Sequence, residues 1–189
     1  MKQNKKPILP KTVNDRLFKS RIIIINGQIT QELVGEVVGQ LLALASESDH
    51  PITLFIHSQG GHVDSGHAIY DAIRFIDARV RVVGIGWVAS AGAFIYVSVP
   101  AEDRYCLPNT RFLLHQPLGG VKGSGSDIAI EAEEIVRIRK RLNTIFSKAT
   151  GQSIEKIQKD TQRNFWLTAE KAQKYGLAGS IVENISEID

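Results

Sequence analysis

The sequence is poor in several features, and each shortage excludes a class of protein. A single cysteine, Cys106, cannot form an internal disulfide, which fits a reducing cytosol and predicts a cytoplasmic protein. The longest apolar stretches, such as residues 91–97, are too short to span a bilayer, and the first lysines have no apolar run behind them. We therefore expect neither a membrane span nor a signal peptide. Lys and Arg total 23 against 20 Asp and Glu, and a net charge of +3 gives no indication of nucleic-acid binding.

What is present is an ordinary globular composition. The 189 residues are 43% hydrophobic and 23% charged, which excludes a disordered or fibrous chain. A chain of this length can bury about 70% of its unfolded surface, so it can build one core without disulfides or metals. We place a single domain at residues 15–189. Residues 1–14, where lysines and prolines precede any periodic pattern, are expected to be a mobile segment.

Short strands and helices alternate along the chain. Runs rich in β-branched residues at 21–26, 51–57 and 80–85 predict buried strands, and the segments after them carry apolar residues at helical spacing. Such alternation is typical of an α/β domain with parallel strands and crossover helices. Short strands at 104–107 and 111–115 follow, then a glycine-rich stretch at 119–127 and a long helix to residue 149. Short helices at about 153–162 and 168–175 and a strand near 181–182 complete the prediction.

Three places could carry chemistry, although each has a simpler structural interpretation. Ser90 falls at a strand-to-helix junction, where N–H groups can meet an oxyanion but where a serine is also an ordinary N-cap. Gly60 and Gly61 follow a strand and allow a close backbone approach, or simply a tight turn. His115 ends an apolar strand, and as a general base it would need a serine or cysteine within reach.

The remaining histidines give little support for a metal site. His57, His62 and His67 flank the glycine pair, but no cluster of carboxylates or cysteines accompanies them. His50 lies in a polar loop and is expected to be exposed. We therefore expect no metal.

Taken in their order along the chain, these motifs resemble the proteolytic-subunit family of ATP-dependent Clp proteases. The resemblance runs from about residue 15 to 182 and rests on YDAI at 70–73, ASAGAF at 89–94, LPN at 107–109, HQPLGG at 115–120 and TAEKAQKYGLA at 168–178. It implies a ClpP/crotonase-like wound βαβ fold with a protruding handle, a long helix plus a strand, at about 118–150.

The resemblance also implies an assembly. Subunits of the family form heptameric rings that stack in pairs around a closed chamber, with the N-terminal segment forming axial loops. An AAA+ unfoldase uses ATP to feed unfolded polypeptide into the chamber, and the proteolytic subunit itself uses no cofactor.

Individual roles follow from the same resemblance. Ser90 corresponds to the nucleophile, His115 to the general base and Asn164 to the third triad position. The other implied positions are oxyanion-hole N–H groups at Gly61 and Ala91, substrate-strand binding at Gly60, Gly61 and Leu118, a contact between rings at Gln162 and Arg163, and an unfoldase-docking cleft lined by Phe55, Phe75 and Tyr105.

The triad position departs from the family's pattern, which has Asp there. Asn164 brings no charge, and its NH₂ can stabilise the wrong imidazole tautomer; in a serine protease this change costs on the order of 10⁴ in rate. Asp160 could substitute for it, but closing the preceding helix is the simpler interpretation.

Two further departures point the same way. Gln162 replaces the acidic residue that pairs with the arginine across the rings, and Thr53 replaces an aromatic residue of the docking cleft. We therefore expect a specialised paralogue with an intact Ser90–His115 pair that is weak alone and works best in a mixed barrel with a second paralogue.

Three alternatives remain open beside this peptidase. A structural or regulatory subunit would complete a mixed barrel without cleaving; Asn164 and Gln162 favour it, whereas Ser90 and His115 favour the enzyme. An acyl-CoA enzyme of the crotonase fold is disfavoured by the protease motifs around Ser90 and His115. A Ser–Lys peptidase is disfavoured because no lysine occupies a corresponding motif.

Overall fold

The body of the protein is one mixed sheet, as the computed structural model of residues 11–117 and 122–188 shows. The strands are β1 (Ile22–Ile29), β2 (Ile52–Gly61), β3 (Val80–Ala89), β4 (Arg104–Cys106), β5 (Arg111–Leu114), β6 (Phe165–Thr168) and β7 (Ser180–Ile181). Their order is β1-β2-β3-β4-β7, and a branch continues from β3 to β5 and from β5 to β6. Every pair is parallel except β5–β6. The predicted α/β class with parallel strands is confirmed.

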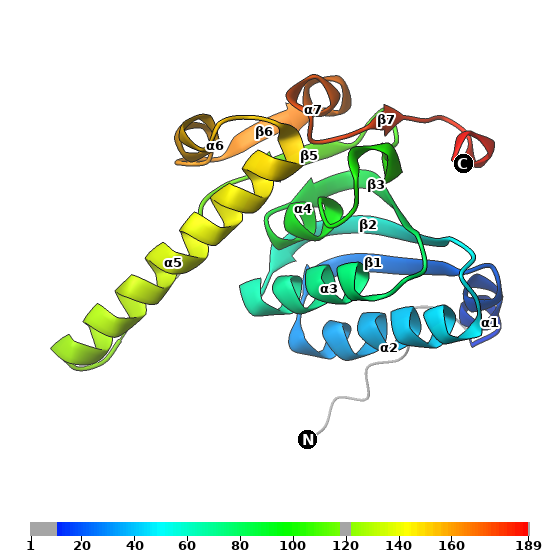
Figure 1. The fold of residues 1–189 in the computed structure, drawn as a ribbon, viewed down its shortest axis with the longest axis horizontal. Coiled ribbons are helices and arrows are strands. Elements are labelled where there is room, and N and C mark those ends of the chain that lie inside the picture. Colours follow the sequence, from blue (N-terminus) through cyan, green and yellow to red (C-terminus); the bar gives the residue numbers. More distant parts are fainter. Residues whose placement is uncertain (1–10, 118–121, 189) are drawn as a thin grey trace.

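Helices lie mainly on one face of this sheet (Figure 1). They are α1 (Lys11–Lys19), α2 (Gln31–Glu47), α3 (Val63–Phe75), α4 (Ala91–Tyr96), α5 (Gly125–Thr150), α6 (Ile154–Asp160) and α7 (Ala169–Tyr175), with 3₁₀ turns at Ala101–Asp103 and Ile185–Glu187. Buried side chains of α2, α3 and α4 share one core with β1, β2 and β3, whereas a smaller cluster around Val83, Tyr105 and Val182 lies apart from it. Within the described ranges, no helix has the length and apolar character needed to cross a bilayer.

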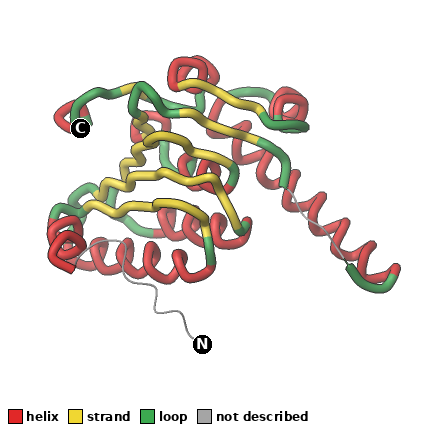
Figure 2. Tube along the Cα trace, turned by 180° about the vertical axis from the view of Figure 1, so that it is seen from behind, coloured by secondary structure: helices red, strands yellow, loops and turns green. Residues whose placement is uncertain are grey.

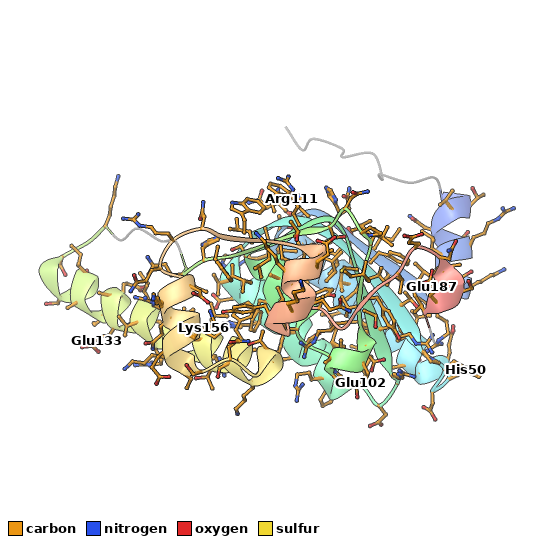
Figure 3. The ribbon with its side chains drawn as sticks, turned by 90° about the horizontal axis from the view of Figure 1, so that it is seen from above. His50, Glu102, Arg111, Glu133, Lys156 and Glu187 are labelled. Carbon is orange, nitrogen blue, oxygen red and sulfur yellow. The ribbon has the colours of Figure 1, made fainter. Side chains whose placement is uncertain are left out.

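The helix α5 extends well beyond the sheet, as the predicted handle does (Figures 1 and 2). Its first turns are exposed, and Glu133 lies on the protruding part (Figure 3). Only residues near its C-terminal end, such as Phe146, are buried. The helix begins two residues before the predicted start because Ser124 and Asp127 form a capping box. The handle strand expected at residues 121–126 is not seen as predicted: residue 121 lies outside the described residues, residues 122–124 form no strand, and residues 125 and 126 belong to α5.

At two places, glycines predict the end of a strand too early. Asn26-Gly27 predicts the end of the first strand, but β1 continues to Ile29, and its register shifts between Asn26 and Gln28. Gly60 and Gly61 predict a separate turn, but they are the last residues of β2 and pair with Gln28 and Ile29. In both places, pairing with the neighbouring strand outweighs the local turn preference.

Two elements have no counterpart in the sequence prediction. The helix α1 spans the boundary that we expect between residues 14 and 15. The position of this domain boundary stays a prediction. The four-residue strand β6 forms because the edge of β5 is available to pair with it, which no local pattern records.

Candidate active site

Ser90 lies between β3 and α4 with a strained backbone. Its φ of 54° and ψ of −121° fall in a region that non-glycine residues rarely occupy and that costs of order 1–3 kcal/mol. Two hydrogen bonds hold it there: Ser90 N donates to Leu113 O at 2.9 Å, and Ser90 O accepts from Phe94 N at 3.0 Å. The Ser90 hydroxyl makes no capping bond to α4. The ordinary N-cap interpretation is therefore wrong, and the side chain is available for chemistry.

The end of β2 packs directly against this junction. A Cβ on Gly60, whose φ is +93°, would lie 2.5 Å from Ser90 Cβ, 2.9 Å from Ala89 O and 3.1 Å from Ala91 N. A Cβ on Gly61 would overlap Ile29 O. Only glycine lets the main chain come this close. Ala91 opens α4, so its N–H has no acceptor within the helix. The geometry thus brings the Gly60–Gly61 main chain and the Ala91 N–H to one place beside Ser90.

His115 shares a pocket with Ser90. The pocket is lined by side chains of α3, α4 and α5 and of the segment at the end of β5: Val63, Ser90, Ala91, Phe94, Leu114, His115, Pro117, Leu142 and Phe146. Most of these are apolar, and the base of α5 forms one wall. Among the described residues, no hydrogen bond joins the Ser90 hydroxyl to His115; instead, His115 Nδ1 lies 2.6 Å from Gln116 O.

Asn164 is brought to His115 by β6. Leu114 pairs with Phe165 in the last pair of the antiparallel β5–β6 ladder, so His115 and Asn164 are the neighbouring residues at the point where the two strands end. Asn164 is exposed, and within the described parts of the chain no hydrogen bond links it to His115. The three residues predicted as a triad therefore lie together without a completed hydrogen-bond chain.

Asp160 is engaged elsewhere. Its carboxylate accepts hydrogen bonds from Lys156 Nζ and Tyr175 Oη, both at 2.7 Å. Burial opposes ionisation, but these two hydrogen bonds outweigh it and lower the pKa of Asp160. Asp160 is the last residue of α6 and ties it to α7, which supports the simpler interpretation of this residue.

Gln116 is a residue to which the sequence assigned no role. Its N–H donates to Thr161 O at 2.8 Å, and its Nε2 donates to Gln162 O at 3.3 Å. The only signal in the sequence was its place in the HQPLGG string. Gln116 connects the end of β5 to the segment that precedes Asn164.

The other predicted positions lie in separate parts of the subunit. Gln162 and Arg163 are exposed, and Leu118 lies outside the described residues. Phe55 packs against the cluster that contains Tyr105, whereas Phe75, 82% exposed at the end of α3, does not belong to it. The structure brings two of the three predicted cleft residues together within this subunit.

The four remaining histidines lie at separate positions in the structure. His57 Nδ1 lies 3.2 Å from Ile85 O, and His62 caps α3 by accepting from Ser65 N. His67 packs edge-on against Phe94, and burial lowers its pKa. His50 is exposed after α2, on the side away from α5 (Figure 3). Across residues 11–117 and 122–188, no group of three or more His, Cys, Asp or Glu is arranged to hold a metal ion.

Known proteins match this chain over almost its whole length. The family model described as Clp protease matches residues 7–185. The "ATP-dependent Clp protease proteolytic subunit 3" of Rhizobium meliloti (strain 1021) is 57% identical over 188 residues, covering 98% of this chain and 96% of the relative. The "ATP-dependent Clp protease proteolytic subunit 2" of Pseudomonas aeruginosa is 53% identical over 171 residues, covering 90% of this chain and 85% of the relative.

Solved structures agree with this match. ClpP1 from Listeria monocytogenes superposes with a TM-score of 0.85 at 48% identity, covering 94% of this chain and 99% of that one. An asparagine-to-aspartate mutant of the same Listeria protein superposes with a TM-score of 0.88 at the same identity and coverage. These superpositions confirm the ClpP-like fold, and with the family model and the relatives they show that this chain belongs to the Clp protease family of proteolytic subunits.

Proposed function

We propose that this chain is a serine endopeptidase subunit in which Ser90 is the nucleophile and His115 the general base. One observation carries the proposal: a strained serine with an uncapped hydroxyl faces the same pocket as His115, beside the Ala91 N–H and the Gly60–Gly61 main chain. Strain of this kind is retained where the surrounding structure holds a residue for function.

The chemistry follows from these positions. His115 takes the proton from Ser90 Oγ as the oxygen attacks the carbonyl carbon of a peptide bond. The N–H groups of Gly61 and Ala91 donate to the oxyanion that forms. His115 then gives its proton to the leaving amine, and water releases the acyl-enzyme. The apolar pocket beside Ser90 suits an apolar side chain next to the cleaved bond.

We expect the substrate to bind in an extended conformation beside Ser90. The peptide would lie as an added strand between Gly60–Gly61 and the segment that begins at Leu118, held by main-chain hydrogen bonds. Such binding is largely independent of sequence, as degradation of many unfolded polypeptides requires.

The assembly is part of the proposal. Ile128, Ile130 and Val136 on α5 are 44%, 66% and 51% exposed, apolar surface around the protruding helix that a second ring would cover. We place the subunit in heptameric rings stacked in pairs through these handles, with Gln162 and Arg163 at the ring contact and residues 1–14 as the axial segment of a peptidase domain at 15–189.

The partners and location follow from the same assembly. An AAA+ unfoldase would dock at Phe55, Phe75 and Tyr105 and would be the subunit that uses ATP. We expect the assembly to lie in the cytoplasm, and this chain to need no cofactor.

Asn164 makes the lone subunit slow. Its side chain brings no charge to stabilise the imidazolium of His115, so we expect Asn164→Asp to raise the rate of fluorogenic-peptide hydrolysis by at least about tenfold, within the ceiling of about 10⁴ set by the reverse change in a serine protease. Gln31→Glu adds the same charge at the exposed start of α2 and should leave the rate unchanged, and Ser90→Ala should abolish hydrolysis in both backgrounds. Rapid hydrolysis by the wild-type chain alone, with no gain in Asn164→Asp, would contradict the proposal.

A structural subunit of a mixed barrel is the second candidate. The observation that favours it is the incomplete hydrogen-bond chain among Ser90, His115 and Asn164 in the described structure. A fluorophosphonate probe distinguishes the two, because it labels only an activated serine. Labelling of Ser90, alone or with a second paralogue present, supports the peptidase; absence of labelling in both supports the structural role.

A further inference from the structure

We propose that the main-chain carbonyl of Gln116 orients the His115 imidazole in place of the triad carboxylate, and that the Gln116 side chain is a positioning residue for that carbonyl. This inference rests on the proposed function, in which His115 is the base. It names a second group, besides Asn164, that determines how His115 works.

The hydrogen bond of His115 selects its tautomer. Nδ1 of His115 lies 2.6 Å from Gln116 O. A carbonyl oxygen can only accept, so Nδ1 must carry the proton of the neutral ring. Nε2 is then unprotonated, which is the form that can accept the hydroxyl proton of a serine. The Asn164 amide could accept from or donate to the ring, so by itself it would select neither form.

Gln116 is held from two sides. Its N–H donates to Thr161 O at 2.8 Å, and its side-chain Nε2 donates to Gln162 O at 3.3 Å. Thr161 is itself buried and donates through Oγ1 to Ile157 O at 2.7 Å, which anchors this segment to the end of α6. Residue Gln116, whose carbonyl accepts from His115, is therefore tied through its N–H and its side chain to the segment that leads into Asn164.

This arrangement separates two effects that an aspartate combines. A triad carboxylate both selects the tautomer and stabilises the imidazolium charge. The Gln116 carbonyl can select the tautomer, but it can stabilise the imidazolium only through its dipole and not through a full negative charge. A subunit built this way keeps its base in the correct tautomer but stabilises the imidazolium charge poorly, so we expect slow rather than absent catalysis.

The tautomer can be observed directly. Magic-angle-spinning NMR of the sedimented, ¹⁵N-histidine-labelled full chain reports which ring nitrogen of each histidine is protonated, and His115→Gln identifies the His115 signals by their loss. We expect Nδ1 of His115 to be protonated and Nε2 unprotonated, in wild type and in Asn164→Ala alike. A His115 protonated at Nε2, or a tautomer that changes in Asn164→Ala, overturns the inference.

A pair of matched variants tests the positioning role. Gln116→Met keeps the length of the side chain and removes the donor to Gln162 O. Gln173→Met removes a comparable bond, from Nε2 of the exposed Gln173 on α7 to Gly179 O at 2.9 Å. For the loss of one such bond we expect Gln116→Met to lower the labelling rate of Ser90 and kcat about five- to tenfold with KM unchanged, and to raise the population protonated at Nε2.

Gln173→Met should change none of these quantities, and Gln116→Lys, which restores a donor, should recover the wild-type tautomer. Equal effects of Gln116→Met and Gln173→Met overturn the positioning role. The NMR measurement does not depend on turnover: an Nδ1-protonated His115 beside a Ser90 that never reacts with the probe sustains this inference and refutes the proposed function.

Discussion

Replacing Gly60 by alanine should disable the site while most of the fold remains. Gly60 has a φ of +93°, where an L-residue costs roughly 1–2 kcal/mol. The added Cβ would lie 2.5 Å from Ser90 Cβ, whereas carbon atoms prefer about 3.5–4.0 Å, so an overlap of about 1 Å must be relieved. Ala89 O and Ala91 N, at 2.9 and 3.1 Å, are backbone atoms and cannot rotate away.

The magnitude follows from these two contributions. Overpacking of a close contact typically costs about 1–3 kcal/mol, which adds to the backbone cost and gives a total of about 2–5 kcal/mol. Relief of the overlap also displaces Ser90 by up to about 1 Å, and a misplacement of that size lowers the rate of reaction by on the order of 10².

Gly27→Ala is the matched control. Gly27 has nearly the same φ, +87°, but a Cβ there would have no atom within 4 Å. It should therefore show the backbone cost alone, about 1–2 kcal/mol, and no loss of Ser90 reactivity. The difference between the two variants isolates the contact with Ser90.

Urea unfolding and the rate of fluorophosphonate labelling together decide the outcome. They should be measured for both variants in the wild-type and Asn164→Asp backgrounds, so that slow wild-type turnover does not hide the effect. If Gly60→Ala proved as stable and as reactive as Gly27→Ala, the close approach of β2 to Ser90 would be refuted.

Two further predictions concern stability and pH. Arg104 is 4% exposed and donates to Val99 O and Ala149 O at 2.8 Å and to Gly176 O and Leu177 O at 3.3 Å, so Arg104→Met should lower the free energy of unfolding by about 3 kcal/mol in a urea titration. The control Arg137→Met removes an exposed pair with Glu134 and should cost less than about 0.5 kcal/mol; equal losses would contradict the role of Arg104. Asp160 has a pKa that hydrogen bonds from Lys156 and Tyr175 lower despite burial, so its stabilisation is full above the ordinary value of 3.8 and is lost as pH falls through the lowered value. Asp160→Asn should therefore destabilise the protein by about 1 kcal/mol at neutral pH and converge with wild type in acid; a difference that grows in acid would show the sign to be wrong.

Some structural features could be predicted because they depend on neighbours in the sequence. Thr30 caps α2 by accepting from Leu33 N, and Gly151 ends α5 in the left-handed conformation, both as their positions predict. The strands rich in β-branched residues also lie where the pattern sets them, although β1 and β2 run further than the glycines suggest. Local propensity gives the centre of an element more reliably than its ends.

The candidate site likewise combines features that the sequence predicts with features that only tertiary contacts create. The sequence by itself determined the α/β alternation and the long helix and, through the family resemblance of its motifs, predicted Ser90, His115 and Asn164 as candidate site residues, because these depend on residue type and order. Only the tertiary structure decided the positive φ of Ser90, the contact of Gly60 with it, the β5–β6 pairing that ends beside His115 and Asn164, and the hydrogen bond from His115 to Gln116. The first three depend on contacts between segments that are distant in the chain, and the last joins neighbouring residues through a conformation of the side chain and backbone that no pattern of residue types records.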